Sequence, residues 1–217
     1  MARTIEDCEA MLRVLAPGFE PLELGGIEPP RCAVAWTADA EPLVRACVEN
    51  AAGLLEAEQI DFPRTKNTYP LFMREVADIH RDLYGDHAEL YGEDVAVKVE
   101  RCLAIGDGEV RSAVRARDEY REAAAAALDG YGVLVTPTIP CVAPRVGVGD
   151  AALRESLIDL TYPFNALGWP ALALPCGTAE DGLPASVQLV GRPGDDALVL
   201  AVGRLLSSLL RGTPAPP

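Results

Sequence analysis

Three short apolar runs between Pro and Gly turns constrain the fold most strongly. The first is Val133–Val135, and Ala171–Leu174 and Ser186–Val190 follow it along the chain. Apolar runs of this length, bounded by Pro and Gly, are typical of buried strands. Beyond them, the pattern over Asp196–Leu210 predicts a final helix, whose acidic start suits the helix dipole. Strands followed by a packed helix predict an α/β fold.

The N-terminal part of the sequence shows the same alternation of helix and strand. Residues 4–16 predict a helix with Thr4 as its N-cap, and Arg31–Trp36 reads as a short strand. Pro42 then opens a predicted helix over residues 42–58 with an apolar stripe along one side. A strand followed by a helix is the beginning of an α/β unit.

Residues 60–108 are predicted to form a variable helical insertion or cap. Leu71–Tyr84 has the spacing of an amphipathic helix, and Val95–Ile105 has that of a second one. His80 and His87 lie seven residues apart on the first helix, roughly 10 Å along its axis at the standard rise. One metal ion cannot bridge that distance, so a solvated acidic face is favoured over a metal site.

The charge of the chain argues against two classes of partner. With 33 acidic and 19 basic residues, the net charge is −14. Nucleic acids and anionic membranes both attract basic patches, so neither is an expected partner. The polar start of the chain contains no signal-peptide core, and no apolar run approaches the length of a membrane span. Six scattered cysteines without a C-x-x-C pair favour a reducing cytoplasm over a disulfide framework or a zinc site.

Four segments, in this order, resemble the motifs of amidase-signature hydrolases. They are Met1–Cys8, Tyr131–Pro140, Thr161–Gly177 and Gly182–Gly191. The resemblance covers the whole chain, residues 1–217, as a partial amidase domain. It is best over residues 109–210 and weak over 60–108, and residues 211–217 are expected to form a tail.

The resemblance implies both a fold and a reaction. The fold would be the C-terminal half of an α/β/α sandwich built around a mixed sheet. The reaction would be hydrolysis of a carboxylic amide C–N bond in a small-molecule substrate, with no metal or cofactor. In this family a nucleophilic serine attacks the carbonyl, a second serine relays its proton to a neutral lysine, and backbone N–H groups bind the oxyanion. A hydroxyl needs such a base, and the tetrahedral intermediate needs such donors.

No residue of this chain matches the catalytic residues of the family, so none is assigned a catalytic role. The family's Gly-Gly-Ser-Ser-Gly-Gly run and its lysine lie upstream of the segment that Met1–Cys8 resembles. Lys66 and Lys98 lie outside any family motif. None of the serines lies in a Gly-rich turn; they are Ser112, Ser156, Ser186, Ser207 and Ser208.

Three interpretations of this half-match remain open. Met1 coincides with an internal methionine of the family motif, which favours a fragment of a longer amidase that is inactive and self-associating on its own. The second is a non-catalytic subunit or remnant that folds with a complementing chain. The third is an independent binding module that kept the pocket walls.

Five residues are candidates for lining a substrate pocket. Thr136 and Thr138 follow a strand, and the carboxyl ends of strands line the ligand crevice of α/β sheets. The alternative for both is a turn stiffened by Pro137. The resemblance implies that Thr161, Tyr162 and Asn165 approach the pocket. The alternative is local, with Thr161 and Asn165 bonding nearby backbone. The family's glutamine-dependent branch carries an Asp seven positions before this Asn, where this chain has Ile158, with Asp159 one position off.

Overall fold

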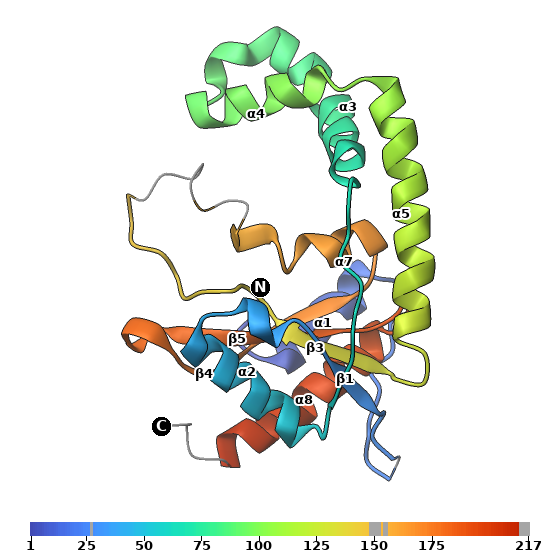
Figure 1. Cartoon of the computed structure of the whole chain (residues 1–217), viewed down its shortest axis with the longest axis vertical. Helices are drawn as coiled ribbons and strands as arrows, with labels where there is room; N and C mark the ends of the chain where they lie inside the picture. The colour runs from blue at the N-terminus through green and yellow to red at the C-terminus, as the bar shows by residue number, and fades with distance from the viewer. Residues whose placement is uncertain (27, 148–152, 154–155, 213–217) are drawn as a thin grey trace. The chain divides into compact units, whose positions relative to one another are not determined.

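The computed structural model describes residues 1–26, 28–147, 153 and 156–212 (Figure 1). The chain divides into two compact units. The first unit contains Met1–Phe62 and Ala125–Pro217, and the second contains Pro63–Ala124. The predicted tail, 211–217, falls mostly outside the described residues.

The first unit is built on one mixed sheet of five strands. Their spatial order is β2-β1-β3-β5-β4. The strands are β1 (Cys32–Val34), β2 (Glu58–Gln59), β3 (Val133–Pro137), β4 (Ala171–Thr178) and β5 (Pro184–Val190). This sheet confirms the predicted fold class.

Strand β3 is the centre of the sheet, and its five residues are all buried. It runs parallel to β1, with Ala33 opposite Leu134, and antiparallel to β5, with Thr136 opposite Gln188. Because side chains alternate across a strand, Val133 and Val135 face one side of the sheet, and Leu134 and Thr136 face the other. Both faces of β3 therefore have to be covered.

Three helices cover the Val133 face. They are α1 (Ile5–Leu15), α2 (Pro42–Leu54) and α8 (Asp196–Gly212). Their apolar sides pack with the sheet into one cluster that includes Val48, Val187 and Leu206, each fully buried. Figure 1 shows α2 and α8 on the same side of the sheet. A short helix, α7 (Tyr162–Leu167), lies over the opposite face.

An ion pair between helices anchors α1 to α8 beside the sheet. The Arg204 guanidinium pairs with the Glu9 carboxylate, and only 19% and 10% of these side chains are exposed. Arg204 also donates to the Leu22 carbonyl at 2.5 Å and lies 3.3 Å from the Glu23 carboxylate. A charge this far from water needs such partners, so Arg204 fixes α1 and the following loop to α8.

The second unit is helical. It contains α3 (Tyr69–His87), a 3₁₀ turn, η2 (Ala88–Leu90), α4 (Glu93–Leu103) and most of α5 (Asp107–Ala127). The Arg74 guanidinium donates to the Asp107 carboxylate at 2.5 Å and ties α3 to the start of α5. The helices predicted from residues 71–84 and 95–105 are confirmed, each with ends shifted by a few residues.

Two predicted boundaries are wrong for identifiable physical reasons. The helix that starts at Pro42 ends at Leu54 rather than at residue 58, and Glu56 has a left-handed φ of 50° before β2. Strand β4 continues past Pro175 to Thr178 through a register irregularity at Pro175/Gly177. An edge strand tolerates Pro because one side of it makes no ladder bonds.

Replacing Leu189 by Ala in β5 should lower the free energy of unfolding by about 2–5 kcal/mol, because it leaves a cavity in a fully buried position. The matched control is Leu43→Ala on α2, where the side chain is 44% exposed and a much smaller loss is expected. Urea unfolding followed by circular dichroism would measure both. Equal losses for the two variants would contradict the description of the core.

Candidate functional site

The candidate site lies at the carboxyl end of the two parallel strands β1 and β3. Trp36 follows β1, and Thr136 and Thr138 end β3 at the same edge of the sheet. Ligands of open α/β sheets bind in the crevice outside this edge. Helix α7 lies over the same face and carries Tyr162 and Asn165. The fold therefore places Thr136 and Thr138 at the carboxyl end of β3, Thr161 at the N-cap of α7, and Tyr162 and Asn165 within α7.

Thr136 is fully buried and belongs to the structural support of the site. Its hydroxyl accepts a hydrogen bond of 3.1 Å from the Gln188 side-chain amide. The same amide nitrogen donates to the Leu160 carbonyl at 3.2 Å, and Gln188 is only 4% exposed. Gln188 thus links β3, β5 and the segment that leads into α7, which is a structural role.

Thr138 is the predicted residue with unused hydrogen-bonding capacity. Its backbone N–H donates to the Ser186 carbonyl at 3.1 Å and extends the pairing of β3 with β5. Its side-chain oxygen is buried and has no hydrogen-bond partner in the described part of the chain. Buried hydroxyls nearly always find a partner, so the Thr138 hydroxyl is an exception within the described residues.

The three predicted residues around α7 differ in what they can offer a ligand. The Thr161 hydroxyl donates to the Ile158 carbonyl at 3.3 Å, which is the local bond given as its alternative. Tyr162 is half-buried at the first helical position. The Asn165 side chain is exposed. The Asn165 backbone carbonyl accepts from the N–H of Gly168, whose φ of 72° ends the helix. Asn165 and Tyr162 are therefore the residues of this group that a ligand could reach.

An aromatic cluster beneath α7 sets the position of that helix. Trp36 stacks on Phe164 with ring centroids 5.4 Å apart, and Phe62 lies 6.2 Å from Trp169. The Trp36 indole N–H donates to the Phe62 carbonyl at 3.0 Å. Trp36 has a φ of 64°, which a bulky residue adopts only where its surroundings hold it. No sequence motif indicated this cluster; the one available signal was an aromatic residue directly after a strand.

The loop after β3 is held by the start of α2. The Glu41 N–H donates to the Pro140 carbonyl at 2.7 Å, and the Leu43 N–H donates to the Glu180 carboxylate at 2.7 Å. A carboxylate at a helix N-terminus is favourable because it satisfies N–H groups that have no partner in the helix. Glu180 therefore anchors the turn between β4 and β5 to the helix that supports Thr136–Pro140.

The cysteines near this loop are poor nucleophiles. Burial, followed by the charges of Glu41 and Glu180, raises the pKa of the Cys141 thiol. Burial raises the pKa of Cys176 to about 12. A thiol reacts as its thiolate, so these groups are unreactive near neutral pH. In the ranges that the structure describes, no three His, Cys, Asp or Glu side chains gather as a metal site would require.

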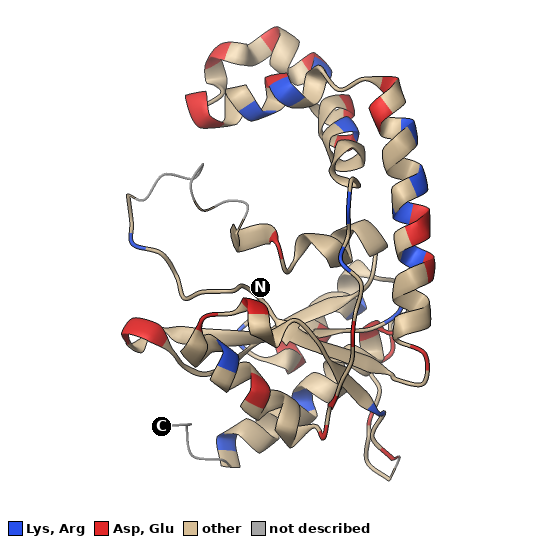
Figure 2. Cartoon of the chain, viewed as in Figure 1, with Lys and Arg blue, Asp and Glu red and all other residues tan. Residues whose placement is uncertain are grey.

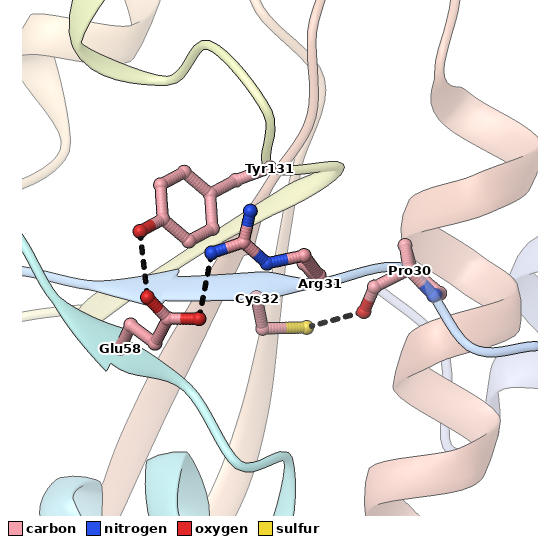
Figure 3. A network of polar contacts seen from close by, with 5 residues as sticks. All are labelled: Pro30, Arg31, Cys32, Glu58 and Tyr131. Atoms are coloured by element: carbon pink, nitrogen blue, oxygen red, sulfur yellow. Dashed lines mark hydrogen bonds and ion pairs between the residues drawn. The ribbon is translucent and has the colours of Figure 1, made fainter.

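A polar network lies at the opposite end of the same strands (Figure 3). Arg31, directly before β1, donates to the Glu58 carboxylate at 2.7 Å, and the Tyr131 hydroxyl donates to the same group at 3.0 Å. The Arg31 guanidinium also lies over the Tyr131 ring, 4.7 Å from its centroid. These bonds lower the pKa of Glu58, with Arg31 the larger cause, and the bond to Glu58 raises the pKa of Tyr131. The network joins β1, β2 and β3 at the end away from the candidate site.

Comparison with known proteins assigns the chain to a family. The family described as Amidase matches residues 39–200. The chain is 29% identical to a glutamyl-tRNA(Gln) amidotransferase subunit of Roseiflexus castenholzii, over 94% of this chain and 52% of the relative. It is 27% identical to an amidase of Pseudomonas putida, over 94% of this chain and 51% of that protein.

Solved structures agree with the sequence relatives. The crystal structure of an amidase superposes with a TM-score of 0.82 and 30% identity, covering 95% of this chain and 51% of that one. The fold and these matches define an amidase-type α/β protein, and the chain belongs to the amidase family. It spans about half the length of the curated relatives it matches. No helix in the described ranges is long and apolar enough to cross a membrane.

Replacing Gln188 by Leu should lower the free energy of unfolding by about 1–3 kcal/mol, because the buried Leu160 carbonyl loses its donor. Gln59→Leu, on an exposed residue of β2, is the matched control and should have a small effect. Urea unfolding measures both variants. An unchanged free energy of unfolding in Gln188→Leu would show that the bond between β5 and the segment before α7 is dispensable for stability.

Replacing Tyr131 by Phe should raise the pKa of Glu58 toward its usual value, because one of its two hydrogen bonds is lost. Since the folded-state pKa is lowered, the network stabilises the fold above the unfolded carboxyl's pKa, and this contribution disappears as the pH falls through the folded-state pKa. NMR titration of the Glu58 side-chain carboxyl measures the shift. An unchanged titration in the Phe variant would mean that the Tyr131 bond does not form in solution.

Proposed function

We propose that these 217 residues form the substrate-side half of an amidase that hydrolyses the C–N bond of a small carboxylic amide. The observation that carries the proposal is the family match over residues 39–200, together with a sheet that has an open edge. In this proposal the Ser–Ser–Lys groups come from a further segment, in the same polypeptide or in another chain. The resemblance implies no metal and no cofactor for this reaction.

The surroundings of the serines support an outside source for the catalytic groups. A nucleophilic serine needs a base in contact with it and an exposed, preorganised turn. Here Ser186 lies inside β5, and its carbonyl is engaged by Thr138. The other serines placed in described elements all lie within helices; they are Ser112 in α5 and Ser207 and Ser208 in α8.

We propose that the completing segment pairs with the edge strand β4. Strand β4 pairs with β5 on one side and ends the strand order on the other. Its Ala171, Ala173 and Pro175 side chains are exposed on the α7 side of the sheet. A groove of about 500 Å³ lies beside it, lined by residues of α1, β4 and α8. An open edge beside apolar surface is a template for pairing with another strand.

The candidate residues take distinct roles in the completed site. Thr138, with its unpartnered hydroxyl, and the reachable Tyr162 and Asn165 are proposed to contact the amide substrate or the completing segment. Thr136 and Thr161 are proposed to support the wall, since both hydroxyls are engaged within the fold. Ile158, in place of the acidic residue of the glutamine-dependent branch, disfavours glutamine as the substrate.

A non-catalytic protein that folds with a complementing chain is the second proposal. The same open edge of β4 supports it, and one relative is itself part of a multi-chain amidotransferase by its name. In both proposals, residues 60–108 form an insertion or cap on a partial amidase domain. The acidic charge and the scattered cysteines support a cytoplasmic location without nucleic acid or membrane partners.

The purified 217-residue chain should release no ammonia from primary amides and no p-nitroaniline from p-nitroacetanilide. It should also take up no fluorophosphonate, because no serine has an activating base within the described residues. Product assays and in-gel fluorescence measure these outcomes, with the Pseudomonas putida amidase as the positive control. Turnover that fluorophosphonate blocks, and that Ser186→Ala or Ser207→Ala abolishes, would overturn the proposal.

A further inference from the structure

Helix α3 carries an apolar stripe that is largely exposed. Its members are Phe72, Val76, Ile79 and Leu83, and Phe72, Ile79 and Leu83 are 39%, 69% and 52% exposed. Large apolar side chains gathered on one helix face usually mark an interaction surface.

The side of α3 next to the stripe is already occupied by α4 and the turn before it. Ala77 is fully buried there. The His80 ring bonds the Tyr91 hydroxyl at 2.8 Å, and the Tyr84 hydroxyl donates to the Glu100 carboxylate at 2.7 Å. At 3.6 residues per turn these three residues of α3 lie together on a face that borders the stripe along one edge. The stripe is therefore not the packing face of the α3–α4 pair.

The spacing of the stripe specifies the shape of its occupant. Its members follow one another at intervals of four, three and four residues. Apolar side chains repeat about every 3.5 residues, on average, along helices that pack against each other in coiled coils. A second helix, lying along α3, is the element that fits a stripe of this period.

The charge beside the stripe specifies the chemistry of that helix. Glu75, Asp82 and Asp86 are exposed along the edge of the stripe that faces away from α4. None of the three forms an ion pair in the part of the chain that the structure describes. Figure 2 shows that acidic residues are prominent on the α3–α4 pair. A partner with lysine or arginine along this edge would be attracted, and one with carboxylates would be repelled.

We propose that α3 docks an amphipathic helix of another protein, with apolar residues at a 3.5-residue repeat and basic residues along the edge facing Glu75, Asp82 and Asp86. A second copy of this chain does not meet that requirement. In a second copy, the edge of the α3 stripe that faces away from α4 carries the same carboxylates. The other edge of that stripe is covered by α4. This proposal is independent of the amidase activity, because it uses only residues of the second unit.

The probe is a 21-residue peptide with Leu at the repeat positions and Lys along the facing edge, labelled for fluorescence anisotropy. The control peptide has the same Leu positions with Glu in place of Lys. The Lys peptide should bind at least about tenfold more tightly than the Glu peptide, and its affinity should fall as NaCl rises from 50 to 500 mM.

Two variants test whether the stripe is the surface that binds. Ile79→Asn should lower the affinity for the Lys peptide at least about tenfold, because a large apolar contact is lost. Val97→Asn, on α4 outside the stripe, replaces a side chain that is 52% exposed and should change nothing. Both sites are exposed, and circular dichroism would verify that both variants fold.

Three outcomes would overturn the proposal. The first is that neither peptide binds, and the second is that both bind equally. The third is that the chain self-associates in light scattering and Ile79→Asn, unlike Val97→Asn, makes it monomeric. That result would assign the stripe to a second copy.

Discussion

The structure depends on the pairing of β3 with its two neighbours. All five residues of this strand are buried, and they pair in parallel with β1 and antiparallel with β5. The alternation along β3 sends Val133 and Val135 to the helices α1, α2 and α8, while Leu134 and Thr136 face α7. Where β3 ends, Thr138 continues the pairing with one backbone bond and leaves its hydroxyl unpartnered within the described residues. The central strand of the core and the wall of the candidate site are therefore the same segment.

Much of this arrangement was predictable from local patterns. The strands at residues 133–135 and 186–190 are apolar runs between turns, and the helix from Asp196 has a continuous apolar stripe. Such patterns reflect burial, which local sequence encodes directly. The strand-end position of Thr136 and Thr138 also follows from local sequence. That these residues contact a substrate is a separate prediction, which stays a prediction.

Other features depend on contacts between distant residues, so no local pattern indicates them. Strand β2 consists of two exposed polar residues, Glu58 and Gln59, and exists only because β1 pairs with it. The extension of β4 beyond Pro175 depends on its place at the sheet edge. Trp36 adopts a left-handed conformation because Phe62 and Phe164 pack around it. Each of these features comes from tertiary packing, which overrides local propensity.

The open edge of β4 and the lack of an activated serine among the described residues point to the same conclusion. We propose that a further segment completes both the sheet and the catalytic site, and the chain spans about half the length of its relatives. The most direct test is to sequence the genomic DNA 5′ of codon 1, in the same reading frame. The account predicts an uninterrupted frame that encodes a lysine and a Gly-Ser-rich segment, or a separate neighbouring gene that encodes both. A stop codon close upstream, with no such segment in any nearby frame or gene, would contradict it.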